Sequence, residues 1–224
     1  MKNSYVVIVG KNVEATIADV VASVPRELGL VVVNDGSEDR TLERIPDEVE
    51  VVSHPLSRGY GAAQKSGYRL ALDSGADRVC LLHGDGQYHP ADVLSLLDAL
   101  DEADVALGSR FLCADGGRVI PWWRRFANRG LTELANWRWG IDMSDLHTGA
   151  RAFRAEVLRS FPFESCSDDY LFDQQILGGL AVQGKRFAER AVSTTYEGDI
   201  QSISPWNSMR YGVGCLRVIF AARH

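Results

Sequence analysis

The chain lacks the features that mark several large classes of protein. Its four cysteines are scattered and form no CxxC pair, so we expect neither a disulfide framework nor a cysteine zinc site. No apolar run reaches the roughly 18 residues needed to cross a bilayer. The opening residues pass directly into a predicted strand, so we expect no signal peptide. The formal net charge of −6 argues against nucleic acid as a partner. Together these absences predict a cytoplasmic protein with reduced thiols.

The chain does have the composition of an ordinary globular domain and a regular alternation of elements. Of its 224 residues, 46% are hydrophobic and 24% are charged, which suits one domain with a large core. Hydrophobic periodicity predicts strands at 4–9, 29–34, 49–54, 77–83 and 103–109, with helices at 13–24, 61–75 and 89–100. This alternation is typical of an α/β protein with a mostly parallel sheet covered on both faces. Ligands of such sheets bind beyond the carboxyl ends of the strands.

The second half of the chain is less regular. It predicts helices at 120–140, 168–184 and 206–224, a loop and short strand at 145–153, and a strand at 185–194. No internal repeat, low-complexity linker or clear domain boundary separates it from the first half. We therefore expect residues 1–224 to form a single domain, in which 111–224 extend 1–110.

Two loops follow the second and third predicted strands. Asp35 heads the turn "DGSEDRT", where its carboxylate could bind a ribose hydroxyl or a base N–H, or cap an Asx-type turn. The segment "RGYGAAQKSG" leads through Gly59 into a helix whose free amides would suit a diphosphate, with Arg58 and Lys65 adding positive charge. It matches neither GxGxxG nor the P-loop, so a purely structural turn is an equal alternative.

The loop after the fourth predicted strand carries a possible metal site. In "CLLHGDGQYHP", His83, Asp85 and Gln87 alternate, so in an extended loop they could point the same way. Imidazole, carboxylate and amide oxygen together suit Mn²⁺ or Mg²⁺, and Mn²⁺ tolerates the imidazole better. A polar turn without a ligand is the alternative.

Taken together and in this order, these segments resemble glycosyltransferase family 2, which has the GT-A fold, and most closely its dolichyl- and polyprenyl-phosphate sugar synthases. The segments that carry the resemblance are "VVIVGKNVEATI", "VVNDGSEDRT", "RGYGAAQKSG", "HGDGQYHPADV", "GSRF", "DLHTGARAFR", "DYLFDQQIL" and "YEGDIQSIS". They cover nearly the whole chain. Several ordered segments are far more specific than any one of them.

The resemblance implies a role for each half of the chain. Residues 1–110 would bind a UDP- or GDP-type sugar, and 111–224 would face the acceptor. Donor-binding residues would be Asn12, Glu14, Asp35, Arg58, Gly59, Lys65, Gly84 and Gln87. Metal ligands would be His83, Asp85 and Gln87, and catalytic residues would be Asp85, Arg110, Asp169 and Asp173. Acceptor-binding residues would be Arg124, Arg125, Asn128 and Thr148.

The chain departs from the family pattern at two loops. After the first strand, Val9, Gly10 and Lys11 stand where the family has Pro, a small residue and Tyr, and Val13 replaces a Glu. This leaves the base of the nucleotide open. His83 replaces the first Asp of the metal loop, which removes one negative charge. We expect weaker Mg²⁺ binding and a relative preference for Mn²⁺.

The family resemblance implies displacement with inversion at the anomeric carbon. An alcohol acceptor would need a general base, for which Asp168, Asp169 and Asp173 are the candidates. Asp169 and Asp173 are four residues apart and would share one helical face, although such a pair is also typical of a solvated face. A phosphate acceptor is already ionised and needs arginines instead of a base.

The segment 108–140 is rich in arginine and tryptophan. Its residues of these types are Arg110, Arg118, Arg124, Arg125, Arg129, Arg138, Trp122, Trp123, Trp137 and Trp139. This combination suits a membrane interface or a core helix with snorkelling arginines. The last predicted helix carries an apolar stripe of Met209, Val213, Leu216 and Phe220, with Arg210, Arg217 and Arg223 elsewhere. We expect the stripe to pack on the domain, with a membrane or homodimer contact as alternatives.

The sequence thus predicts a metal-dependent glycosyltransferase with a polyprenyl-phosphate-type acceptor, at the inner face of the membrane. One alternative is a soluble family 2 enzyme acting on a small-molecule or glycan hydroxyl. The other is a non-catalytic nucleotide-binding relative, motivated by the altered first and metal loops.

Overall fold

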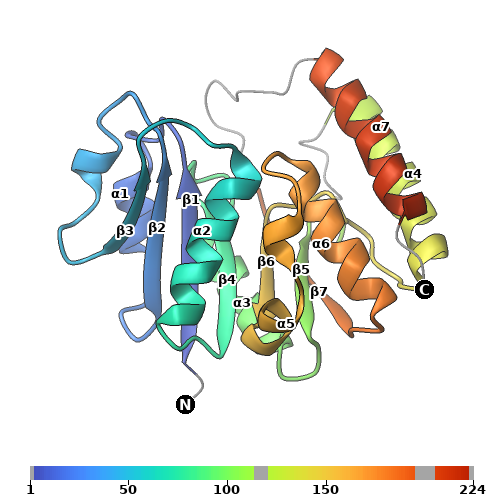
Figure 1. Ribbon diagram of the computed structural model, residues 1–224, viewed down its shortest axis with the longest axis horizontal. Coiled ribbons are helices and arrows are strands. Elements are labelled where there is room, and N and C mark those ends of the chain that lie inside the picture. Colours follow the sequence, from blue (N-terminus) through green and yellow to red (C-terminus); the bar gives the residue numbers. More distant parts are fainter. Residues whose placement is uncertain (1–2, 114–120, 195–204, 222–224) are drawn as a thin grey trace.

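A seven-stranded sheet forms the centre of the molecule, in the order β3-β2-β1-β4-β6-β5-β7 (Figure 1). The computed structural model describes residues 3–113, 121–194 and 205–221, the last from 209 onward with side chains. The strands are β1 Ser4–Gly10, β2 Gly29–Asp35, β3 Glu50–His54, β4 Arg78–His83, β5 Val105–Ser109, β6 Arg151–Arg154 and β7 Phe187–Ala191. Only β6 runs against its neighbours β4 and β5. The expected mostly parallel α/β sheet is confirmed.

Helices cover both faces of this sheet (Figure 1). The helices are α1 Ile17–Ala22, α2 Tyr60–Asp73, α3 Pro90–Ala99, α4 Trp122–Trp139, α5 Ala155–Ser160, α6 Leu171–Val182 and α7 Pro205–Ala221, with short 3-10 turns η1 Leu42–Arg44 and η2 Phe163–Ser165. Successive residues of a strand point to opposite faces of the sheet and therefore belong to different hydrophobic cores. Val7 and Val9 belong to the core under α2 and α6, whereas Val6 and Ile8 belong to the core under α1 and α3.

Helix α2 lies unusually close to the sheet because of one glycine. A Cβ on Gly67 would stand 2.2 Å from Cγ1 of Val7 and 3.0 Å from Cγ2 of Val33. Only a residue without a side chain therefore fits between α2 and strands β1 and β2. The close packing fixes the start of α2 relative to the carboxyl ends of these strands.

Several predicted helices are shorter in the structure. The helix expected at 13–24 begins only at Ile17, after a turn at 14–16, and the amide of Val13 donates to Oγ1 of Thr41 at 2.8 Å. The helix expected at 168–184 begins at Leu171. The sequence did not predict α5, nor the antiparallel insertion of β6.

The antiparallel direction of β6 matters for the site. Arg151, at the start of β6, pairs with Leu81 near the end of β4 and with Leu107 near the end of β5. The segment that precedes β6 therefore reaches the same sheet edge as the carboxyl ends of the parallel strands. Beyond α6, at the right of Figure 1, α4 and α7 pack side by side. Within the described ranges, no helix is both long and apolar enough to span a bilayer.

Candidate active site

Asp35, at the end of β2, organises the turn that precedes α2. Its carboxylate accepts hydrogen bonds from Oγ of Ser57 at 2.7 Å and from the amides of Arg58 and Gly59 at 2.8 and 3.0 Å, and it lies 2.6 Å from Nδ1 of His54. Burial alone would raise the pKa of Asp35, but these hydrogen bonds outweigh it and hold the pKa below 3.8. Both oxygens are thus engaged by the protein, and the role of Asp35 toward a nucleoside stays a prediction.

The amides of Gly61 and Ala62 at the start of α2 are not free, so the expectation for these two groups is wrong. The amides of Gly61 and Ala62 donate to the carbonyl of Asp168 at 2.8 and 3.2 Å. Gly59 has a φ of +106°, and a Cβ there would stand 2.4 Å from the same carbonyl oxygen. The glycines therefore admit a neighbouring backbone segment, which occupies the helix terminus in place of a diphosphate.

Lys65 and Arg58 differ in where their charges lie. Lys65 is buried, and its Nζ lies 2.8 Å from Oδ1 of Asp168 and also donates to the carbonyl of Cys166. The Lys65 ammonium group is therefore used inside the protein. Arg58 is exposed at the sheet edge. Of the two predicted donor-binding cations, Arg58 is the one that can reach an anionic ligand.

The metal loop is a turn and not an extended segment. Residues 84–86 form the turn, and Gly86 has a φ of +70°. Asp85 is exposed, and its Oδ1 accepts the amide of Gln87 at 3.0 Å. His83 faces inward, because its Nε2 lies 2.9 Å from the hydroxyl of Tyr60. The expectation that all three predicted ligands point the same way is therefore wrong.

The donor set fits a cation only in part. His83 packs edge-to-face against Tyr60 and Tyr88, at centroid distances of 5.5 and 5.4 Å, and burial lowers its pKa below the usual 6.5. Asp85 with Gln87 beside it offers the oxygen ligands that Mn²⁺ and Mg²⁺ prefer. No cluster of three or more His, Cys, Asp or Glu suited to a metal occurs in the part of the chain that the structure describes. A cation here would need further oxygens from a bound ligand.

A buried ion pair that sequence reasoning missed lies beside this loop. Arg151 is fully buried, with Nη1 2.7 Å from Oδ1 and Nη2 2.8 Å from Oδ2 of Asp173. Nε2 of Gln64 also donates to Oδ1 of Asp173 at 2.8 Å, and Oε1 of Gln64 accepts from Tyr68. Asp173, a predicted base, thus has both oxygens bound by protein donors. In the sequence, the only feature that pointed to this ion pair was Arg151, the last residue of "DLHTGAR".

Asp169 lies outside α6, so the expected shared helical face with Asp173 is wrong. Its Oδ1 accepts the amide of Leu171 and the hydroxyl of Ser167, both at 2.8 Å, in an Asx-type turn just before α6. The carboxylate is exposed. Of the three predicted bases, Asp169 is the one not held in an ion pair with a cationic side chain of the described chain.

Arg110 and Thr148, predicted to be catalytic and acceptor-binding residues, lie near the ends of β5 and the segment that precedes β6. The Arg110 guanidinium group binds Asp145 through Nε at 2.8 Å and Nη2 at 3.1 Å, and Nη2 also donates to the carbonyl of His147 at 2.8 Å. Thr148 is buried and accepts the amide of Ala150. This segment is therefore rigidly built, with Arg110 positioned by Asp145.

His147 joins the same segment to α7. Its Nδ1 lies 3.1 Å from the hydroxyl of Tyr211, while its Nε2 is buried without a hydrogen-bond partner in the described structure. Burial lowers the pKa of His147 to about 4. The ring is therefore neutral at physiological pH.

Asn12, Glu14 and Gly84, also predicted to bind the donor, connect neighbouring loops. Oδ1 of Asn12 accepts the amide of Glu38 at 2.8 Å, and Oε2 of Glu14 accepts the amide of Arg40 at 2.9 Å. The amide of Gly84 donates to the carbonyl of Val9 at 2.9 Å. All three predicted residues thus lie at the carboxyl edge of the sheet, close to the β2 turn or the β4 turn.

Helix α4 presents aromatic side chains to solvent. Trp122, Phe126 and Trp137 are 76%, 79% and 75% exposed, and the Arg124 guanidinium lies 5.0 Å from the ring centroid of Trp123. Arg125 and Asn128, also predicted to meet the acceptor, lie on the same helix. The core-helix alternative therefore fails for much of α4.

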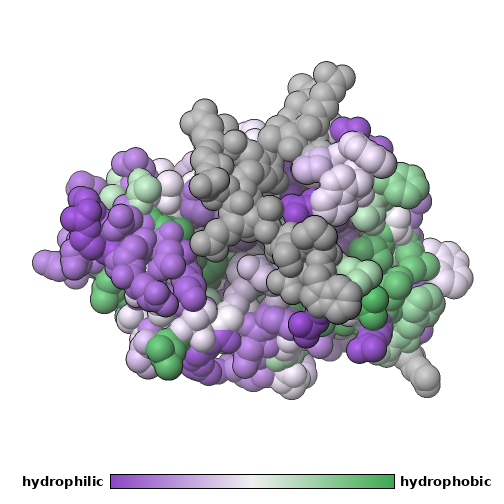
Figure 2. Space-filling view, turned by 90° about the horizontal axis from the view of Figure 1, so that it is seen from above, coloured by the Kyte–Doolittle hydropathy of each residue, from purple (hydrophilic) through white to green (hydrophobic). Residues whose placement is uncertain are grey.

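Helix α7 continues this apolar surface. Its predicted stripe of Met209, Val213, Leu216 and Phe220 is exposed, whereas Cys215 and Ile219 face the core, so the expected packing of the stripe is wrong. Figure 2 shows hydrophobic side chains gathered toward the end of the molecule where α4 and α7 lie. Arg118, Arg223 and the "YEGDIQSIS" segment lie outside the described residues.

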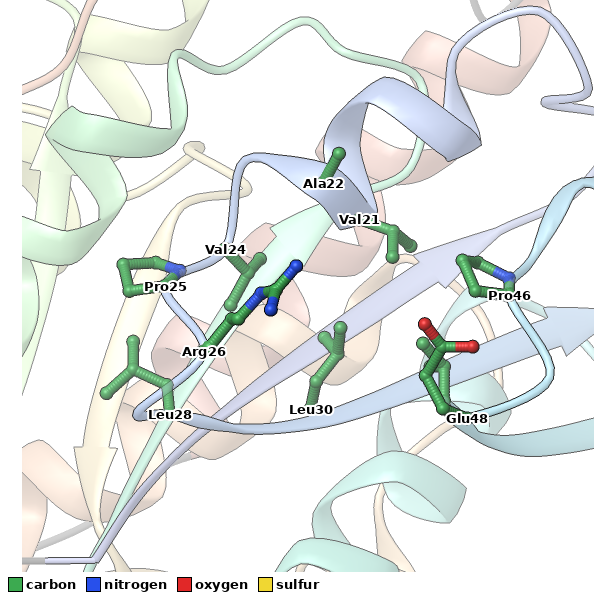
Figure 3. Close-up of a pocket in the computed structure, with 10 residues that line it drawn as sticks. Val21, Ala22, Val24, Pro25, Arg26, Leu28, Leu30, Pro46 and Glu48 are labelled. Carbon is green, nitrogen blue, oxygen red and sulfur yellow. The ribbon is translucent and has the colours of Figure 1, made fainter.

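A separate hollow of about 520 Å³ lies at the amino ends of β2 and β3 (Figure 3). Aliphatic side chains such as Val24 and Leu30 line it, with Arg26 and Glu48 as its charged members. None of its lining residues belongs to the loops at the carboxyl ends of the strands, so it is no part of the candidate active site.

Comparison with known proteins identifies the family. The sequence pattern of "Glycosyl transferase family 2" matches residues 5–161, well over half of the chain. Polyprenol monophosphomannose synthase of Mycolicibacterium smegmatis is 31% identical over 155 residues, which cover 65% of this chain and 58% of that protein. Undecaprenyl-phosphate mannosyltransferase of Micrococcus luteus is 29% identical over 172 residues, 73% of this chain and 70% of that protein.

Solved structures agree on the fold. Glucosyl-3-phosphoglycerate synthase from Mycobacterium tuberculosis, in complex with Mn²⁺, UDP and phosphoglyceric acid, superposes with a TM-score of 0.70 at 21% identity, over 100% of this chain and 80% of that one. The GT-A fold and the resemblance to polyprenyl-phosphate sugar synthases are both confirmed. The chain therefore belongs to glycosyl transferase family 2.

Proposed function

We propose that this protein is an inverting glycosyltransferase that moves a sugar from a nucleotide-diphosphate sugar to a polyprenyl-phosphate-type acceptor. The observation that carries the proposal is the meeting of two segments at one sheet edge. The exposed Asp85 turn follows β4, and β6 brings the 145–151 segment with the Arg110–Asp145 pair to the same edge. The names of the two relatives support the acceptor class.

On the donor side, the leaving diphosphate needs compensation of its negative charge. Asp85, with Gln87 beside it, would hold a Mn²⁺ or Mg²⁺ ion, which when bound supplies positive charge at that diphosphate. The structural relative crystallised with Mn²⁺ and UDP supports a divalent ion and a UDP- or GDP-type donor. Arg58, exposed at the same edge, adds a second positive charge.

In the reaction, an acceptor oxygen attacks the anomeric carbon while the bond from that carbon to the diphosphate oxygen breaks. An ionised phosphate acceptor needs no proton removed, whereas an alcohol does. Asp173 and Asp168 are held in ion pairs with Arg151 and Lys65, which leaves Asp169 as the base for an alcohol. The scarcity of uncommitted bases favours a phosphate acceptor.

The α4–α7 surface supports a lipid-linked acceptor. We use this name for the exposed aromatic and aliphatic residues of α4 and α7 together with their exposed arginines: Trp122, Phe126, Trp137, Met209, Val213, Leu216, Phe220, Arg129, Arg210 and Arg217. Aromatic rings with arginines are typical of helices that lie in a membrane interface. We propose that the protein is peripheral, at the inner face of the membrane, with this surface toward the lipid.

The test is a transfer assay with purified protein, a panel of UDP- and GDP-sugars, Mn²⁺, and polyprenyl phosphate in anionic vesicles. A glycosylated lipid phosphate should form, and Asp85→Asn should lose the activity. Failure of every donor with this acceptor would overturn the proposal. Retention of full transfer and donor binding by Asp85→Asn would instead favour a non-catalytic nucleotide-binding relative.

A soluble acceptor is the second candidate, because the structural relative was crystallised with phosphoglyceric acid, a small phosphorylated molecule. Vesicle flotation separates the two candidates. Association that is lost in a Trp122→Ser/Phe126→Ser variant supports the lipid acceptor. No association, together with turnover on a soluble hydroxyl compound, supports the second candidate. A concentration-dependent dimer in sedimentation that the same variant abolishes would assign the α4–α7 surface to a homodimer.

A further inference from the structure

His83 stands at the position where the family's metal loop has its first aspartate, but its surroundings differ from those of a metal ligand. The ring packs between Tyr60 and Tyr88. Gly149 lies against its edge so closely that a Cβ there would stand 2.3 Å from Cε1 and 2.6 Å from Nε2 of His83. The Nε2 edge of the ring is therefore closed by protein.

The hydrogen bond to Tyr60 also occupies the Nε2 atom of His83. Nε2 lies 2.9 Å from the Tyr60 hydroxyl, and either atom can be the donor. If the hydroxyl donates, the lone pair of Nε2 is used as the acceptor, and if Nε2 donates, it carries a proton in place of that lone pair. In both cases Nε2 has no free lone pair for a metal ion.

The contact links three parts of the site. His83 ends β4, Tyr60 begins α2, and the ring of Tyr60 stacks on that of Tyr170 just before α6, at a centroid distance of 5.2 Å. From this geometry we infer that His83 is a positioning residue and not a metal ligand, which leaves a divalent cation to Asp85 and to oxygens of the donor. The part of this inference that concerns the cation rests on the proposed function, whereas the contact between His83 and Tyr60 does not depend on it.

Electron spin-echo spectroscopy of Mn²⁺ tests whether His83 is a metal ligand. With the full chain, Mn²⁺ and UDP, we expect no nitrogen coupling from a bound imidazole. His83→Gln should bind Mn²⁺ as tightly as the unaltered protein, whereas Asp85→Asn should bind it more than about tenfold more weakly. A nitrogen coupling that disappears in His83→Gln would overturn the inference. Failure of Mn²⁺ to bind with UDP would overturn the assignment of the cation to Asp85.

Variants that keep or remove the hydrogen bond to Tyr60 test whether His83 is a positioning residue. The glutamine amide of His83→Gln can still accept the Tyr60 hydroxyl, but the side chain of His83→Leu cannot. We expect His83→Leu and Tyr60→Phe to lower kcat by similar factors, with unchanged Mn²⁺ dependence, and His83→Gln to retain most of the rate. The double variant His83→Leu/Tyr60→Phe should be no slower than either single variant. Independent, multiplying losses would contradict a shared role.

The same variants separate this inference from the proposed function. In thermal unfolding without ligand, the decrease in Tm of the double variant should be smaller than the sum of the two single decreases, since both remove one contact. Additive decreases would overturn the positioning role. If no sugar donor is turned over, the proposed function fails, while the unfolding data still test the contact between His83 and Tyr60.

Discussion

The buried pair of Arg151 and Asp173 makes a prediction that separates structure from catalysis. Asp173→Asn keeps the shape of the side chain but removes its charge. Arg151 is fully buried and binds Asp173 through both Nη atoms, at 2.7 and 2.8 Å. Removing one partner of such a pair leaves an uncompensated buried charge, which costs about 3–5 kcal/mol. Since 1 kcal/mol shifts the Tm of a protein of this size by about 2–4 °C, the variant should melt roughly 6–20 °C lower.

Urea unfolding followed by circular dichroism measures this loss as a lower midpoint at unchanged m value. Asp169→Asn is the matched control, because Asp169 is exposed and the asparagine oxygen can still accept the amide of Leu171. It should change the free energy of unfolding by no more than about 0.5 kcal/mol. The paired replacement Arg151→Met/Asp173→Leu should recover much of the loss, because it removes both charges together.

One result would refute the reasoning. If Asp173→Asn unfolds at the same urea concentration as the unaltered protein but has lost transfer activity, then Asp173 is a catalytic base and the ion pair contributes little. In that case Asp169→Asn should remain active. The opposite pattern, a destabilised but active Asp173→Asn with a stable but inactive Asp169→Asn, would assign the base to Asp169.

Three further predictions follow from single residues. Burial lowers the pKa of His147 from 6.5 to about 4, so between these pH values only the unfolded chain binds a proton at this residue. The free energy of unfolding is therefore at its full value above pH 6.5 and decreases by up to about 3 kcal/mol as the pH falls to 4. His147→Gln should flatten this slope in urea unfolding at stepped pH. The lowered pKa of Asp35 gives stability that is present above pH 3.8 and is lost as the pH falls further, so Asp35→Asn should lack that part of the acid transition followed by fluorescence. Gly59→Ala should lower the Tm more than Gly184→Ala. Both glycines have a positive φ, but only at Gly59 would a Cβ stand against the Asp168 carbonyl. Equal decreases in Tm would contradict this close contact.

The sheet could be predicted because its signal is local. Side chains of β1 are buried on both faces of the sheet, Val7 and Val9 on one face and Val6 and Ile8 on the other. A short continuous apolar run in the sequence indicates a strand that is buried in this way. The carboxyl ends of parallel strands then place Asp35 and the His83–Asp85 turn at one edge. The fold class and the shared sheet edge of these two loops could therefore be predicted from the sequence.

The pairing of side chains within the site could not be predicted, because it depends on contacts distant in sequence. Gln64 and Asp173 are hydrogen-bonded across 109 residues. The carbonyl of Asp168, which occupies the start of α2, is a backbone group and leaves no mark in residue types. The antiparallel β6 breaks the simple alternation, and it alone brings Arg151 beside the end of β4.

Helix α2 connects the turn after β4 with the segment before α6, and this has a consequence for how variants combine. Its first residue, Tyr60, contacts His83 after β4, while Gln64 and Lys65 contact Asp173 and Asp168 at the start of α6. Because these contacts share one rigid helix packed directly on the sheet, a change near α6 can shift the end of α2 that faces the β4 turn. Losses from variants on the two sides should therefore fail to add, unlike losses from sites more than about 7–10 Å apart without shared partners.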